Sequence, residues 1–430
     1  MFRRPGWTSW PAALANRARV QRGAWVVADQ AVVSLASFLA TAIVGRVCGR
    51  YELGIYGLAV SIFWLAAGIP NALVWTPYTS RSARMPVGRR ALFAGSATIH
   101  AVLVALAISA VVLLVGLVPL AGIGQAAWLG PMCLALVPFT IMMIVREHVR
   151  RISTANLDLR DLLLVDVPIA VVQLALILSL ASAGLLTAVT ALLAIALASC
   201  GAAVWLVRRR DRIHFDLQRV TVHWGYNQRF GRWLLFVSLM WLLGDSAYRW
   251  LVGSLHGLEA LGQFAAAQTI VLSLNPFVLS AGNLTQALAS HRLAGSGIGE
   301  LRRLVVRGTL LIAVLAGAAF SVLAVVGGPL VELVFGDQYV GLGRVVATLC
   351  LGMFARFVSL PIQAAMVALE HGRWMLAASV VRIALILGAG VPLIWWCGLE
   401  GVGYTMALST AAAAAVQWYL FARGGRHAAS

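Results

Sequence analysis

Ionisable side chains inside apolar segments are the residues of this sequence best able to do chemistry. Asp29 lies in an apolar stretch near the start of the chain, and Arg22 lies on the same helical face seven residues earlier. Asp245 and Arg249 are four residues apart in a later stretch, so a helix brings them together as a pair. A charge inside a bilayer costs about 3 kcal/mol or more, so we expect these groups to face a cavity. The alternative is that Arg249 extends to the membrane surface while Asp245 neutralises it.

Further charged groups lie within or at the ends of other apolar segments. Arg46 ends the first segment, where it either reaches the membrane surface or contacts a substrate. Arg356 and Arg382 lie deeper, and for them we favour a packing role between helices in the second half of the chain. Asp166 is expected to pair with a neighbouring arginine such as Arg146, or to lie near the membrane interface.

Neutral polar residues concentrate in the eighth apolar segment. They are Gln268, Asn275, Asn283 and Gln286. Pro276 is expected to break this segment near its centre and to free backbone carbonyls for a ligand, and Pro70 and Asn71 play a similar part in the second segment. Segments one, two, seven and eight therefore have the composition of a cavity wall. A cavity with excess arginine suits an anionic substrate, because the guanidinium fork matches phosphate oxygens.

The elements that must position these residues are transmembrane helices. Hydrophobic residues make up 61% of the chain and charged residues only 11%, against about 25% charged in soluble domains. Apolar runs long enough to cross a core of about 30 Å recur along the sequence. We place them near 24–47, 54–77, 92–118, 124–145, 162–182, 185–207, 233–253, 260–288, 308–327, 342–368, 375–396 and 401–421. The predicted fold class is all-α, a polytopic membrane protein of about 12 helices.

Arginines between these segments predict the orientation. The clusters include Arg3, Arg4, Arg17, Arg19 and Arg22 before the first segment, Arg146, Arg150 and Arg151 after the fourth, and Arg208, Arg209 and Arg210 after the sixth. They occupy alternate connections, so the positive-inside rule places both termini in the cytoplasm. The same placement explains the net charge of +18 as a membrane feature, and we expect no nucleic-acid partner.

The longest connection, 208–232, divides the chain into two similar halves. A shift of 208 residues aligns Leu53-Gly54 with Leu261-Gly262, and Gly49 with Gly257. We therefore expect an N-terminal lobe at 1–207, a cytoplasmic arginine-rich loop at 208–232 and a C-terminal lobe at 233–430. Two repeat-related six-helix lobes enclose a central cavity in transporters of the alternating-access type.

The connections are too short for a soluble catalytic domain. We find no phosphate-binding loop, no HExxH motif and no GxSxG motif in a strand-turn-helix context. The five cysteines lack CxxC spacing, so neither a disulfide nor a metal site is assigned. We expect a protein that is not an enzyme and holds no cofactor; a membrane-embedded glycan enzyme is the alternative of another class.

Short motifs near the ends of the segments resemble one known superfamily. The motifs are Arg46-x-x-Gly49-x-x-Glu52-x-Gly54-x-Tyr56, its echo Leu258-Glu259-x-x-Gly262-x-Phe264, then Phe335-Gly336-Asp337-Gln338-Tyr339 and Gly401-x-Gly403. Together with the two lobes, they are similar to the polysaccharide (O-antigen-type) flippases of the multidrug/oligosaccharidyl-lipid/polysaccharide exporter superfamily.

This resemblance implies that an undecaprenyl-diphosphate-linked oligosaccharide is flipped from the cytoplasmic to the periplasmic leaflet of a bacterial inner membrane. It implies that Arg22, Arg46 and Arg249 contact the diphosphate or acidic sugars, with Gln268 and Asn275 in the substrate cavity. Asp29 and Asp245 would couple ion or proton movement. Polysaccharide polymerase or co-polymerase proteins would be partners. A cation-coupled multidrug exporter and a lipid II flippase are the alternatives within the superfamily.

Overall fold

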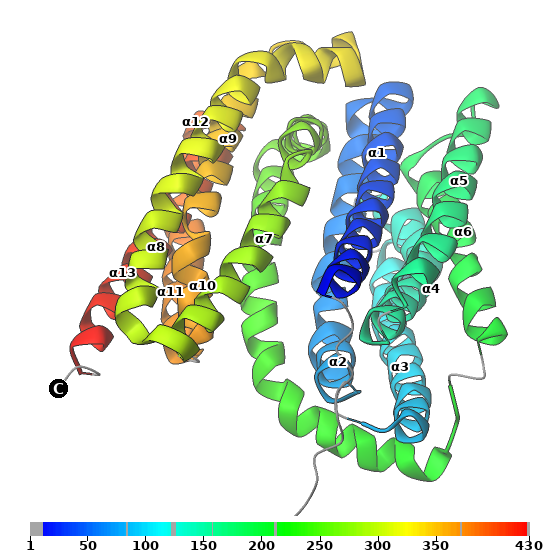
Figure 1. Ribbon diagram of the computed structural model, residues 1–430. Helices are drawn as coiled ribbons and strands as arrows, with labels where there is room; N and C mark the ends of the chain where they lie inside the picture. The colour runs from blue at the N-terminus through cyan, green and yellow to red at the C-terminus, as the bar shows by residue number, and fades with distance from the viewer. Residues whose placement is uncertain are drawn as a thin grey trace, which may run out of the picture.

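The computed structural model describes residues 12–82, 85–121, 126–156, 158–209, 213–369 and 372–427. Within these ranges every regular element is a helix (Figure 1). The elements are α1 (Ala12–Pro70), η1 (Asn71–Trp75), α2 (Thr76–Ser82), α3 (Val87–Leu120), α4 (Leu129–Ala155), α5 (Leu159–Ser182), α6 (Ala188–Arg208), α7 (Leu217–Leu272), α8 (Asn275–Phe335), η3 (Asp337–Tyr339), α9 (Gly343–Val358), α10 (Leu360–Ala368), α11 (Gly372–Gly388), α12 (Gly390–Cys397) and α13 (Glu400–His427). The predicted fold class, an all-α polytopic membrane protein, is confirmed.

Two long helices each contain a glycine that breaks the helix. α1 has 59 residues, which at about 1.5 Å per residue would be far longer than a bilayer core of about 30 Å. Gly49 interrupts it with φ 87° and ψ −179°, a left-handed region that side chains disfavour. Gly257 interrupts α7 in the same way, with φ 84° and ψ 179°. Figure 1 shows α7 rising to one end of the molecule and turning back there, so each helix supplies two spans.

Among the described residues, eight helices are long and apolar enough to cross a membrane, or nine when one bent pair is counted as a span. Counted with the bent pair, there are nine spans. The break in α1 at Gly49 adds one crossing, the break in the bent pair at Gly257 adds another, and the 28 residues of α13 add a third. The total is the twelve crossings that the sequence predicts. The bent pair joins α7 to α8 at an angle of 52°. This is the break expected beside Pro276. Pro70 is likewise followed by a turn of π-helix, η1.

The helices form two groups (Figure 1). α1 to α6 lie on one side of the molecule and α8 to α13 on the other, and α7 passes from the first group to the second. α7 begins at Leu217, so most of the segment 208–232 is helical and not the loop that the sequence suggests. Its first part lies across the end of the molecule beneath α2 and α3. The exact limits of the two lobes, 1–207 and 233–430, stay a prediction.

The two groups meet backbone to backbone where α1 contacts α7. A Cβ atom on Gly54 would lie 2.0 Å from the carbonyl oxygen of Leu258, and a Cβ atom on Gly262 would lie 1.8 Å from that of Arg50. No side chain fits at either position. The two contacts are related by the shift of 208 residues, because Arg50 matches Leu258 and Gly54 matches Gly262. The contact surface therefore follows the internal repeat. We call this end of the molecule, defined by Gly49 and Gly257, the glycine end.

Contacts within each group at the glycine end obey the same repeat. Cys48 donates a hydrogen bond to the carbonyl of Leu186, at 3.3 Å. The Nε2 atom of His256 lies 2.8 Å from the carbonyl oxygen of Ile394. These two residues follow Cys48 and Leu186, respectively, by 208 positions. Equivalent positions thus hold equivalent turns in place, which supports a duplicated fold.

The opposite end of the molecule is the arginine end. α2 ends at Ser82, directly after Arg81, and α6 ends at Arg208. α8 turns near Gly297, and Arg302 and Arg303 follow that turn. Among the described residues, these four arginines of the orientation-predicting clusters therefore lie at the end away from Gly49 and Gly257.

Replacing Gly54 or Gly262 with alanine should push α1 and α7 apart. We expect each variant to lose about 1–3 kcal/mol of stability, the usual cost of overpacking, seen as a lower melting temperature of the purified protein. Gly57→Ala is the matched control, because its Cβ would meet the Ala265 Cβ at an ordinary 3.4 Å. Equal melting of Gly54→Ala and Gly57→Ala would contradict the contact.

Candidate functional site

A cleft of about 910 Å³ opens between the two groups of helices, on the arginine side of the glycine contact. Both halves of α1 line it, through residues such as Gln30 and Trp64. α7 and α8 form the facing wall, with Trp241, Thr269 and Asn275. These are the four spans that the sequence predicts as cavity walls. A fifth span, α4, adds a wall of charged residues that is not among the predicted cavity walls.

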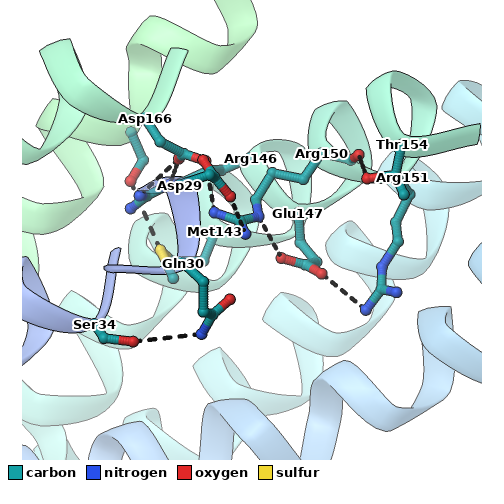
Figure 2. Close-up of polar contacts among 11 residues, drawn as sticks. Asp29, Gln30, Ser34, Met143, Arg146, Glu147, Arg150, Arg151, Thr154 and Asp166 are labelled. Atoms are coloured by element: carbon teal, nitrogen blue, oxygen red, sulfur yellow. Dashed lines mark hydrogen bonds and ion pairs between the residues drawn. The ribbon is translucent and has the colours of Figure 1, made fainter. Parts of the chain in front are cut away.

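Two carboxylates behind this wall are held by arginines of α4 (Figure 2). Asp166 of α5 is fully buried and accepts hydrogen bonds from Arg146 Nε at 2.8 Å and from Arg150 at 2.5 Å. Arg150 also donates to Asp29 of α1, at 2.9 Å. One guanidinium therefore joins α1, α4 and α5. Asp166 pairs with Arg146, as the sequence suggests.

Glu147 and Arg151 form the part of this network that faces the cleft. Glu147 lies 2.9 Å from Arg151 and 3.6 Å from Arg150 Nε. The Arg151 side chain is 42% exposed, whereas that of Arg150 is 17% exposed and that of Asp166 is fully buried. The three arginines balance the carboxylates of Asp29, Glu147 and Asp166. The network is thus neutral when all members are ionised, and its outermost ion pair is the one a ligand can reach.

The predicted fourth span ends at residue 145, which puts Arg146, Arg150 and Arg151 in a loop, so this wall is not among the predicted cavity walls. In the structure α4 continues to Ala155. The sequence does carry a signal for the longer helix: no glycine or proline occurs between 139 and 156, and Glu147 precedes Arg151 by one helical turn. An arginine cluster at the end of a span is compatible with both a loop and a cavity.

Asp245 does not pair with Arg249, which corrects the expected pair. Asp245 forms ion pairs with Arg382 of α11 and with Arg356 of α9, the latter at 3.3 Å. Arg249 instead donates to the side-chain oxygen of Gln268, at 2.7 Å and 3.1 Å. Their helix spacing allowed a pair, but charges from other helices outcompete the local partner. Arg356 and Arg382 bridge helices of the second group, which is the packing role that the sequence favours for them.

The remaining candidate residues lie in different places. Asn275 lines the cleft, whereas Arg46 lies near the glycine end and donates to the carbonyl of Leu333 at 2.8 Å. Arg249 and Gln268 bind each other across the two halves of α7 and are not among the cleft-lining residues. The side chain of Arg22 lies outside the described residues. The structure therefore does not bring the predicted substrate-binding residues together at one point.

The motif Phe335-Gly336-Asp337-Gln338-Tyr339 has a role in joining the two groups. Tyr339 donates its hydroxyl to the carbonyl of Gly45 at 3.1 Å, and Gln338 donates to the same carbonyl at 3.2 Å. Phe335 packs against Gly45 so closely that a Cβ there would lie 2.6 Å from the ring. Together with the Arg46 contact, this motif closes the glycine end. In the part of the chain that the structure describes, no three metal-ligating side chains lie together.

Removing Asp166 should destabilise the protein strongly. Asp166→Ala leaves Arg146 and Arg150 buried without that counter-charge, which costs about 3–5 kcal/mol. We expect its abundance in the membrane, measured by fluorescence-detected size-exclusion chromatography, to fall several-fold. Glu147→Gln is the control, because its side chain is 24% exposed to the cleft. Normal abundance of Asp166→Ala would contradict a structural role for the buried pair.

Solved structures of transporters share this fold. An inward-facing MATE family transporter of the MOP superfamily matches with a TM-score of 0.71 and 15% identity, over 91% of this chain and 94% of the other. An outward-facing structure of such a transporter gives a TM-score of 0.61 and 16% identity, over 94% of each chain. A MOP superfamily transporter from Pyrococcus furiosus, described as having a binding pocket of reverse polarity that suggests a different function, gives 0.65 and 16%, over 94% of each chain.

At these identities the likeness concerns the fold alone, and no curated protein matches the sequence. The sequence does match a family model, described as "Polysaccharide biosynthesis protein", over residues 67–343. That range is more than half of the 430 residues and includes the α4 wall and the α7 and α8 wall of the cleft. This protein therefore belongs to the polysaccharide biosynthesis protein family and has the fold of the MOP-superfamily transporters.

Proposed function

We propose that this protein flips an undecaprenyl-diphosphate-linked oligosaccharide from the cytoplasmic to the periplasmic leaflet of a bacterial inner membrane, as a transporter and not as an enzyme. The observation that carries the proposal is the cleft between the two helix groups, with a charged wall on α4 and a neutral polar wall on α7 and α8. Membership of a polysaccharide biosynthesis family supports a glycan cargo.

The conformation fits the loading step of such a cycle. Gly54, Gly262 and the contacts of Tyr339 close the glycine end, and the cleft lies towards the arginine end. The higher TM-score against an inward-facing relative, 0.71 against 0.61, is in line with this. By the positive-inside rule the arginine end would face the cytoplasm, which is where a lipid-linked precursor is loaded in this proposal. The same rule assigns both chain termini to the cytoplasm.

The two walls suit the two parts of the cargo. A diphosphate would compete with Glu147 for Arg151, the most exposed arginine of the network, and a guanidinium binds phosphate oxygens with paired hydrogen bonds. Thr269, Ser273 and Asn275 on the facing wall offer neutral donors and acceptors for sugar hydroxyls. Arg150 would stay on Asp29 and Asp166, so binding changes only the outer ion pair. Asp29 and Asp245 remain the proposed ion- or proton-coupling groups.

The negative charge of Glu147 in the cleft also favours a second candidate function, the export of cations. Glu147 faces the cleft, so a cationic drug could replace Arg151 as its partner. A cation-coupled multidrug exporter is therefore the alternative within the superfamily, and a lipid II flippase shares the diphosphate chemistry. Polysaccharide polymerase or co-polymerase proteins are the proposed partners.

Deleting the gene tests the cargo directly. We expect loss of a surface polysaccharide and accumulation of its lipid-linked precursor on the cytoplasmic leaflet, measured by glycan staining and by mass spectrometry of extracted lipids. An unchanged surface glycan together with increased drug sensitivity would contradict the proposal and favour the exporter.

Arg151→Gln, expressed in the deletion strain, tests the site. We expect export to fall about tenfold, the effect of losing one charge-assisted contact of about 1.4 kcal/mol, at normal membrane abundance. Arg307→Gln is the control, because Arg307 is an exposed arginine that does not line the cleft. If Arg151→Gln restores export as well as Arg307→Gln does, Arg151 does not bind the cargo.

A further inference from the structure

A second hollow, of about 690 Å³, lies at the arginine end and is separate from the cleft. It is formed where α2 and the start of α3 meet the first part of α7. Figure 1 shows that part of α7 lying across the end of the molecule. Arg81, Arg89 and Arg219 line the hollow with His223 and Tyr226, and none of these residues lines the cleft.

The hollow carries excess positive charge. Arg219 forms an ion pair with Asp216 at 3.0 Å. Arg81 stacks over the Tyr226 ring, with its guanidinium carbon 3.9 Å from the ring centroid. Among the described residues neither Arg81 nor Arg89 forms an ion pair, and no carboxylate lines the hollow. Stacking fixes the plane of the Arg81 guanidinium while its charge stays uncompensated, which is the state of a residue prepared for an anion.

His223 adds a titratable donor to the hollow. Its Nδ1 lies 2.8 Å from the hydroxyl oxygen of Ser96, whose hydrogen is donated to the carbonyl of Leu92 at 3.3 Å. The Ser96 oxygen therefore accepts from Nδ1–H, and Nε2 is the nitrogen that can take up a proton. Burial lowers the pKa of His223, and Arg81 and Arg219 lower it further, whereas Asp216 raises it. An anion in the hollow would raise this pKa and turn His223 into another donor.

The charged and titratable groups around His223 among the described residues are Arg81 of α2, Arg89 and His100 of α3, and Asp216, Arg219 and Tyr226 in or next to α7. One of them, Asp216, is acidic. The excess of cationic groups means that neutral His223 is favoured in the empty site and protonated His223 in the anion-bound site. Proton uptake and anion binding are thus linked.

The surroundings of the hollow place it at the level of lipid headgroups. Phe215, which lies just before α7, is 62% exposed, and Leu217 and Val222 in its first turns are 77% and 69% exposed. Apolar side chains beside arginines on a helix that precedes a span are typical of a segment lying in the membrane interface. Anionic headgroups concentrate at that depth and attract basic segments.

We propose that this hollow is a binding site for the phosphate of an anionic phospholipid headgroup, held by Arg81, Arg89 and Arg219 with His223 as a protonatable donor. The bound lipid would join α2 and α3 to the first part of α7, which leads into the second helix group. The site is independent of the cargo that passes through the cleft.

Native mass spectrometry of the full-length protein in detergent tests the site. The probes are short-chain phosphatidylglycerol, phosphatidylcholine as a headgroup without net charge, and inorganic phosphate as a soluble competitor. We expect phosphatidylglycerol to bind more tightly than phosphatidylcholine, with about tenfold weaker binding in Arg89→Gln plus Arg219→Gln, as expected for lost charge-assisted contacts. Arg307→Gln, at the same end but outside the hollow, should bind like the unaltered protein.

Protonation gives a second readout. Between about pH 8 and about pH 5.5, which brackets the ordinary histidine pKa of about 6.5, binding should become tighter as the pH falls, and His223→Gln should lose most of that change. Melting temperatures of all variants show whether they remain folded. Equal binding of the two lipids, or unaltered binding by the folded double variant, would overturn the proposal. Displacement of the lipid by inorganic phosphate at equal concentration would overturn the lipid source and indicate a soluble phosphorylated ligand.

Discussion

The structure depends on the backbone contact between α1 and α7 at the glycine end. Gly54 and Gly262 let each helix approach a carbonyl of the other to a distance at which no Cβ fits. Close approach through small residues is the main way in which helices associate inside a membrane, where apolar burial gives little advantage. Because the contact lies at one end of the two helices, they are free to diverge towards the other end. The cleft occupies the space that this divergence leaves.

Buried ion pairs keep each helix group together while the cleft lies between them. Arg150 joins α1, α4 and α5 through Asp29 and Asp166. Asp245 joins α7, α9 and α11 through Arg356 and Arg382. Neither network crosses from one group to the other, so relative motion of the groups breaks no buried ion pair. A rocking motion would instead open the contacts of Gly54, Gly262 and the motif at residues 335–339, which consist of hydrogen bonds and van der Waals packing.

Much of the architecture is predictable from local sequence patterns. Apolar runs predict the spans and Pro276 predicts the broken eighth span, because each of these depends only on neighbouring residues. The glycines that recur after 208 residues predict the repeat, because a duplication is visible by aligning the sequence with itself. The partners of charged residues are not predictable in this way. Arg249 has Asp245 one turn away, yet the structure gives it Gln268 across the break at Gly257. Asp245 meets Arg356 and Arg382 only because three distant helices pack together.

The charged residues of the candidate site are likewise only partly predictable from the sequence. The sequence predicts four of the five spans that line the cleft, since polar residues mark α1, α7 and α8. The α4 wall is absent from the prediction because the arginine content alone does not distinguish a helix that continues from a loop that follows it. The signal for the longer helix is the lack of glycine and proline between 139 and 156. Arg46 donates a hydrogen bond to the carbonyl of Leu333 near the end of α8. Its position at the end of a span is compatible with this role and with substrate binding, so the sequence does not distinguish them.

The claim that the two helix groups alternate about the glycine end can be measured by pulsed electron paramagnetic resonance. Spin labels at Val47→Cys and Val340→Cys, two exposed positions at that end in different helix groups, would be placed in a variant whose five native cysteines are replaced. Without cargo we predict one short distance. A diphosphate-linked lipid oligosaccharide should add a second, longer distance. An unchanged single distance at saturating cargo would contradict alternation about this contact.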